Sequence, residues 1–131
     1  MSERVEEYMA LVDGLVATRD SAAARRVMDG VWHGHRASDG LRFKDLLTTL
    51  QPAQRDSLAE IVQGTADAAI CDVLVFLADQ GFRLSRDGVE LAVKPFGNEM
   101  HQDFLRRRDG AHWPASRAEA APTQSQDGPN V

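Results

Sequence analysis

The architecture of this 131-residue chain depends most on residues 66–80, which read Ala-Asp-Ala-Ala-Ile-Cys-Asp-Val-Leu-Val-Phe-Leu-Ala-Asp-Gln. Apolar side chains recur there at spacings of three and four, and the same pattern begins upstream, just after Pro52. It predicts a helix over 53–80, with Pro52 in the first turn and Gly81 closing the end. Gly64 leaves two possibilities open, one long helix or two helices that break near this residue.

The second half of this segment is apolar on nearly every side. Polar residues occupy one face of the first half, and they are Asp56, Glu60, Gln63 and Asp67. If the helix is continuous, the same face then carries Cys71, Leu74, Val75 and Ala78, whereas the opposite face carries Ala69, Val73, Phe76 and Leu77. A helix that is apolar all round must be covered on both sides. We therefore expect a subunit interface formed by Cys71, Leu74, Val75 and Ala78, in a twofold homodimer.

Three further helices are predicted before this segment. An amphipathic pattern predicts a helix over 3–18, and a short helix follows at 22–28. Residues 31–38 show no period and are predicted to be a loop, after which Ser38 or Asp39 can cap a third helix.

A two-residue period follows the central helix and predicts a β-hairpin with strands 82–86 and 89–93. Asp87 and Gly88 form the turn, because a type I′ turn needs positive φ at both central residues. This turn fixes the pairs, which are Leu84–Leu91 and Phe82–Val93 on one face and Ser85–Glu90 and Arg83–Ala92 on the other. A last helix is predicted over 99–108, with Asn98 as its cap.

These patterns predict one helix-dominated α+β domain over residues 1–113. Four to five helices surround a central apolar helix, and the hairpin and the last helix follow it. Residues 114–131 contain three prolines and no aromatic residue, so they are predicted to be a disordered tail.

Composition narrows the class of protein. The chain is 43% apolar and 27% charged, which excludes collagen-like, wholly disordered and disulfide-stapled proteins. Cys71 is the only cysteine, no signal-type segment opens the chain, and the longest nearly apolar stretch, 68–78, is too short to span a membrane. We therefore expect a cytoplasmic protein. Arginine greatly outnumbers lysine, which suggests a bacterial source with a GC-rich genome.

The net charge of −5 gives the chain no general attraction to nucleic acid or to anionic membranes. We expect neither as a partner, and no cofactor motif is present. A homodimer is the partner that the apolar central helix favours.

Four histidines are the candidates for a metal site, and they are His33, His35, His101 and His112. Imidazole and carboxylate groups are ligands of zinc and non-haem iron, but no two histidines stand four apart on a predicted helix. Ordinary surface histidines are the alternative. A second possibility is a pocket lined by Trp32, His33, His101 and Trp113, because both tryptophans adjoin a histidine. The competing interpretation is that both tryptophans only cap the core.

Asp72 lies in the most apolar segment and forms a narrow polar stripe with Thr65 and Asp79. Either this stripe meets solvent, or Asp72 pairs with an arginine such as Arg26, Arg42 or Arg83. No catalytic set is evident, so a non-enzymatic interaction or structural module that acts as a homodimer is favoured. The alternative is a small metal-binding protein or hydrolase-type enzyme that uses the histidines and Asp72.

Overall fold

The computed structural model describes residues 1–19, 21–31 and 37–115, and its architecture is the predicted helix-dominated α+β. The described elements are α1 (Glu3–Thr18), α2 (Ala22–Met28), α3 (Ala37–Thr49), α4 (Pro52–Asp79), β1 (Ser85–Arg86), β2 (Val89–Glu90) and α5 (Met100–Arg108). Helix α3 begins at Ala37, so the prediction of a loop through residue 38 is wrong at its end. The predicted tail beyond residue 115 lies outside the described residues.

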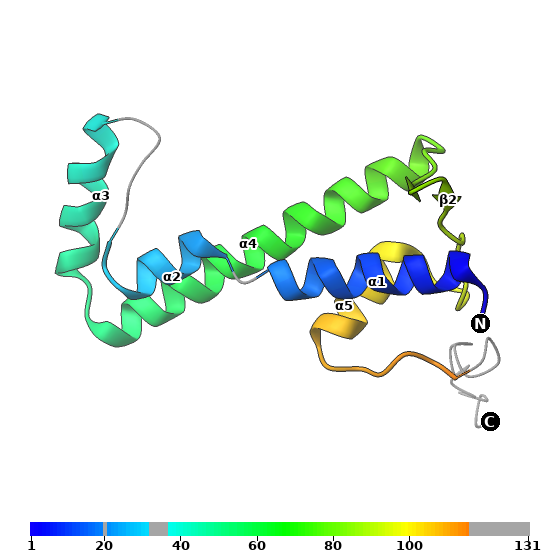
Figure 1. Cartoon of the computed structure of the whole chain (residues 1–131). Coiled ribbons are helices and arrows are strands. Elements are labelled where there is room, and N and C mark those ends of the chain that lie inside the picture. The colour runs from blue at the N-terminus through cyan, green and yellow to red at the C-terminus, as the bar shows by residue number, and fades with distance from the viewer. Residues whose placement is uncertain (20, 32–36, 116–131) are drawn as a thin grey trace, which may run out of the picture.

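Helix α4 is the axis of the molecule and runs unbroken through Gly64 (Figure 1). It begins with a capping box, in which the side chains of Gln51 and Gln54 accept from each other's backbone N–H groups. It ends at Gly81, whose φ of 72° is the left-handed conformation that favours glycine. Because neighbouring helices pack on α4 on both sides of Gly64, the weak helix propensity of one glycine does not break it.

Two hydrophobic clusters lie at different levels of α4. The smaller cluster joins α2, α3 and the first half of α4 through Val27, Leu47 and Ala59. The larger cluster joins α1, α5, the second half of α4 and the segment after it, and its buried members are Tyr8, Val12, Leu74, Leu91, Phe96 and Phe104. Figure 1 shows the same division, with α2 and α3 at one end of α4 and α1, α5 and the hairpin at the other.

The hairpin has the predicted register but shorter strands. Ser85 pairs with Glu90 and Arg86 with Val89 around a turn in which Asp87 and Gly88 both have positive φ. Beyond one more hydrogen bond, from Leu91 N–H to Leu84 O at 2.9 Å, the two strands separate.

The reason is that the N–H of Phe82, which the next hydrogen-bonded pair would need, donates instead to Leu77 O in the last turn of α4. On the outer edge of the hairpin, Ala92 N–H donates to Arg4 O in the first turn of α1. The predicted pair of Phe82 with Val93 therefore does not form, and both side chains are exposed.

Helix α5 begins one residue later than predicted. Its N-cap is Glu99, which forms a capping box with Gln102. Asn98 does not cap the helix, and its side-chain amide instead donates to the buried carboxylate of Asp103.

Candidate functional site

The two faces of the second half of α4 have opposite environments. Leu74 is 7% exposed and packs in the larger cluster, with Cys71 partly buried beside it. Val75 is half-buried and Ala78 is exposed at the edge of a cavity. Leu74 thus offers no surface to a partner, and the face predicted to be the interface is the one that packs inward. Burial raises the pKa of the Cys71 thiol, which makes it a weak nucleophile.

The opposite face of α4 is the uncovered one. Ile61 is 66% exposed, and Val73 and Phe76 are each 57% exposed. We call the outer face the exposed stripe made of Ile61, Thr65, Ala68, Ala69, Asp72, Val73 and Phe76. Beyond its end, the ring of exposed Phe82 lies 6.2 Å from the ring of Phe76, which extends the apolar surface toward the hairpin.

Asp67 determines which face of α4 turns inward. Its carboxylate is 4% exposed and accepts from Arg19 Nη1 at 2.9 Å and from Gln63 Nε2 at 3.0 Å. Arg108 Nη1 lies 3.6 Å away, on α5. A buried carboxylate needs such partners, so these contacts fix the rotation of α4 about its axis. Asp67 belongs to the polar face that the sequence predicts, but its arginine partners lie 48 residues before it and 41 residues after it, where no local pattern reveals them.

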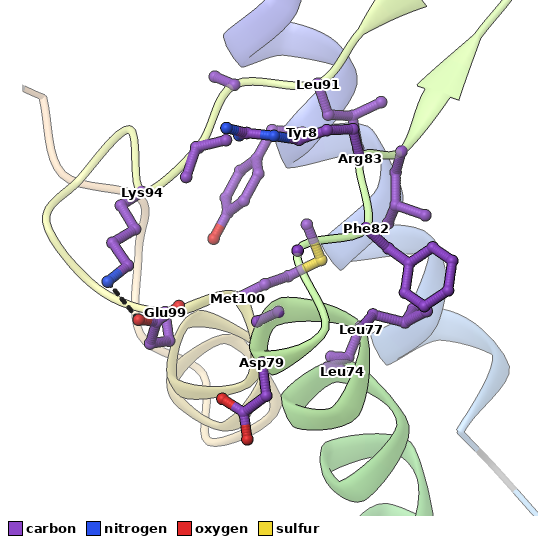
Figure 2. A pocket seen from close by; sticks show the side chains of 15 residues that line it. Tyr8, Leu74, Leu77, Asp79, Phe82, Arg83, Leu91, Lys94, Glu99 and Met100 are labelled. Atoms are coloured by element: carbon purple, nitrogen blue, oxygen red, sulfur yellow. Dashed lines mark ion pairs between the residues drawn. The ribbon is translucent and has the colours of Figure 1, made fainter.

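A cavity of about 310 Å³ opens between the end of α4, the segment around the hairpin and the start of α5 (Figure 2). Its walls are mostly apolar, and Tyr8, Leu74, Leu77, Leu84, Leu91 and Met100 belong to them. Charged side chains occur where it opens to solvent, among them Arg83 and the ion pair between Lys94 and Glu99. No sequence pattern predicts this cavity, because it depends on how the hairpin strands separate.

Two residues of the predicted tryptophan–histidine pocket, Trp32 and His33, lie outside the described residues, as does His35. The prediction that the pocket forms therefore stays a prediction. Trp113 packs in the larger cluster, where its ring lies 5.1 Å from that of Phe96 and its Nε1 donates to Asp13 at 3.0 Å. Its role is therefore to hold the segment after α5 against the core.

The two described histidines, His101 and His112, do not belong to any cluster of side chains that could coordinate a metal ion. His101 is half-buried on α5 and His112 is exposed. Within residues 1–19, 21–31 and 37–115, no group of three or more His, Cys, Asp or Glu side chains could hold a metal ion. Asp72, Thr65 and Asp79 are all exposed, so the polar stripe meets solvent, as the simpler interpretation expected.

Helix α4 is long and apolar enough to cross a membrane, by length and composition only. Its most apolar window has a mean hydropathy of 1.7, and 11% of that window is buried. The expectation that no segment is long enough to span a membrane is therefore wrong as far as length is concerned. Asp67, near the middle of α4, is bound by Arg19 and Arg108.

Comparisons with known proteins identify a family but no activity. A family model described as "Family of unknown function (DUF6547)" matches residues 1–115. No curated protein and no solved structure matches the chain. The matched range covers α1 to α5 and ends where the described residues end.

Proposed function

We propose that this chain, which belongs to the DUF6547 family of unknown function, is a non-enzymatic interaction module that acts as a homodimer through the outer face of α4. The observation that carries the proposal is the exposure of Ile61, Val73 and Phe76 along one straight helix. Scattered apolar side chains are normal on a protein surface, but a contiguous apolar stripe indicates an interaction site.

The order of residues along the outer face is self-complementary. Six of its members lie within an arc of about 100° at 100° per residue, in the order Ile61, Thr65, Ala68, Ala69, Asp72, Phe76. Read in reverse, the order is again a large apolar residue, a polar residue, two alanines, a polar residue and a large apolar residue. Two copies of α4 packed antiparallel therefore match each other, as a twofold interface requires.

The antiparallel arrangement gives six of the seven residues of the outer face a suitable opposite. Ile61 meets Phe76 of the partner subunit, and Ala68 meets Ala69 of the partner subunit at the centre, where small side chains let two helices approach closely. Thr65 meets the partner's Asp72. The Thr65 hydroxyl now donates to Ile61 O at 2.8 Å and can turn to donate to that carboxylate instead.

A second copy suits this face better than a chain of unrelated chemistry for a geometric reason. The outer face carries exposed Ile61 at one end and Phe76, beside exposed Phe82, at the other. In an antiparallel dimer, one end of the outer face of each subunit lies beside the other end of the outer face of its partner. The partner therefore covers the apolar surface at both ends together with the rest of the outer face. The single thiol and the arginine-rich composition support a place in a bacterial cytoplasm.

Sedimentation equilibrium at micromolar concentration tests the proposal. The wild-type chain is expected to be a dimer, and Ile61→Gln combined with Phe76→Gln is expected to weaken dimerisation at least tenfold, because two apolar side chains leave the interface. Met28→Gln is the matched control, since Met28 is 53% exposed on α2 and away from the outer face. A wild-type monomer, or a dimer equally weakened by the control, would refute the proposal.

A further inference from the structure

We infer that the cavity beside the hairpin binds a small ligand with an unbranched apolar body and a terminal carboxylate. Exposed Phe82 lines this cavity and also borders the outer face of α4, but the interior of the cavity is formed by inward-facing residues such as Leu74 and Leu91. The inference rests on these interior residues and not on the homodimer.

The walls of the cavity select the apolar body. Leu91 lies in their upper part, and Leu74, Leu77 and Met100 form their floor (Figure 2). Leu84 also lines the cavity. A volume of about 310 Å³ lies at the lower end of the range for small-molecule sites. Met100 is an unbranched, flexible side chain, and such a wall adapts to a chain-like ligand more readily than a rigid aromatic wall.

The charged groups at the opening select a carboxylate. Lys94 already has an anionic partner, because its ammonium forms an ion pair with Glu99 on α5. Arg83 has no hydrogen-bond or ion-pair partner among the described residues, and Figure 2 shows its side chain extending over the cavity. A guanidinium is a planar fork that matches a carboxylate with two parallel hydrogen bonds.

The remaining acidic group does not neutralise this guanidinium. Asp79 lines the cavity at its far side, and Figure 2 shows its carboxylate directed away from Arg83, beyond Met100. The opening therefore presents one unpaired cation above an apolar interior, which is the arrangement that an amphipathic anion complements.

The backbone at Lys94 holds the opening in place. Lys94 has a φ of 47°, a conformation that non-glycine residues seldom adopt, and its carbonyl accepts from Gly97 N–H at 3.0 Å. Such strained positions cluster at binding sites, because the surrounding structure must hold them there. The turn at 94–97 thus fixes the Lys94–Glu99 pair at the rim and prevents the hairpin segment from collapsing into the cavity.

Isothermal titration calorimetry with octanoate, 1-octanol and octylamine tests the inference. Octanoate is expected to bind most tightly, and each methylene removed from it is expected to weaken binding about fourfold. Arg83→Gln is expected to weaken octanoate binding at least tenfold and to leave octanol binding unchanged, since a charge-assisted hydrogen bond is lost. Arg106→Gln is the matched control, because Arg106 is exposed on α5 and does not line the cavity.

A second variant identifies the place of binding. Ala78 lines the cavity with an exposed side chain, so Ala78→Phe fills the space without disturbing the buried cluster. It is expected to abolish octanoate binding while the circular dichroism spectrum and melting temperature stay close to wild type. Octanoate that still binds Ala78→Phe occupies another surface, and this result overturns the inference.

Two other results also overturn it: no heat with any of the three probes, or equal affinity for octylamine and octanoate. The same titration on the Ile61→Gln, Phe76→Gln double variant separates this inference from the proposed homodimer. Octanoate affinity is expected to be unchanged there, because neither residue lines the cavity.

Discussion

The Tyr8 hydroxyl donates to Asp103 Oδ2 at 2.7 Å, and both side chains are almost completely buried. The bond joins α1 to α5 across 95 residues of sequence. Asp103 accepts a second hydrogen bond from the Asn98 amide at 3.0 Å, so its two oxygens are both satisfied. Burial, followed by the bond to Asp103, raises the pKa of Tyr8 far above its ordinary value. The closure of the larger cluster therefore depends on a neutral tyrosine.

This dependence predicts a loss of stability at alkaline pH. The unfolded chain releases the Tyr8 proton near pH 10, whereas the folded chain retains it. The stabilisation is fully present below about pH 10, and the free energy of unfolding falls by up to about 1.4 kcal/mol per pH unit above it. Urea denaturation at a series of pH values measures this slope.

Tyr8→Phe provides the control for the same titration. Removal of the hydroxyl leaves Asp103 with one donor fewer, so the variant is expected to lose about 1–3 kcal/mol at neutral pH. Above pH 10, the free energy of unfolding of this variant should fall less steeply with pH than that of wild type. The difference in slope is the contribution of the one proton that Tyr8 releases on unfolding. Equal slopes in the two proteins would show that other groups cause the alkaline loss.

Elements with a strong local signal could be predicted from the sequence. The amphipathic pattern of α1 gave its bounds, and the Asp87-Gly88 turn gave the register that pairs Ser85 with Glu90. Both depend on interactions between residues close in sequence, where period and turn chemistry leave few alternatives. The end of the hairpin was not predictable, because Phe82 N–H bonds to α4 instead of to the opposite strand.

The orientation of α4 could not be predicted for a different physical reason. A helix that is apolar all round has no preferred side, so its own pattern does not say which face packs inward. Contacts distant in sequence decide it, above all those of Arg19 and Arg108 with Asp67. The candidate interface was accordingly placed on the face of Leu74, and the cavity at Arg83 and Lys94 was not anticipated.

Asp67→Ala is predicted to lower the free energy of unfolding by about 2–3 kcal/mol. Removal of a buried partner leaves other groups without compensation, but Arg19 and Arg108 are about one-third exposed and can be rehydrated. Chemical denaturation measures the loss. Asp56→Ala is the matched control on the same helix, since Asp56 is exposed and does not belong to the outer face, and it should change stability by less than about 0.5 kcal/mol. Equal losses in both variants would contradict the role given to Asp67.

Adjacent residues of α4 should respond differently to truncation. Leu74→Ala removes a side chain from the larger cluster and is predicted to cost about 2–5 kcal/mol of the free energy of unfolding. Val73→Ala removes a side chain that is 57% exposed, and in dilute monomeric protein its cost should stay below about 1 kcal/mol. Denaturation of both variants at nanomolar concentration makes the comparison. The reverse order of costs would mean that α4 is rotated about its axis relative to the structure.

The antiparallel pairing makes a prediction about distance. Ser57 is exposed near the start of α4, and a spin label on Ser57→Cys, in a Cys71→Ala background, reports the separation of the two labelled positions in the dimer. At 1.5 Å per residue, pairing centred between Ala68 and Ala69 separates the labels by about 35 Å. Parallel pairing of the same faces would separate them by only about 10 Å, the spacing of two packed helices.

Double electron–electron resonance distinguishes the two values, and a peak at the longer distance that disappears with Ile61→Gln and Phe76→Gln is the expected result. A distance unaffected by that double variant would place the contact on another surface, because the outer face would then contribute nothing to the association.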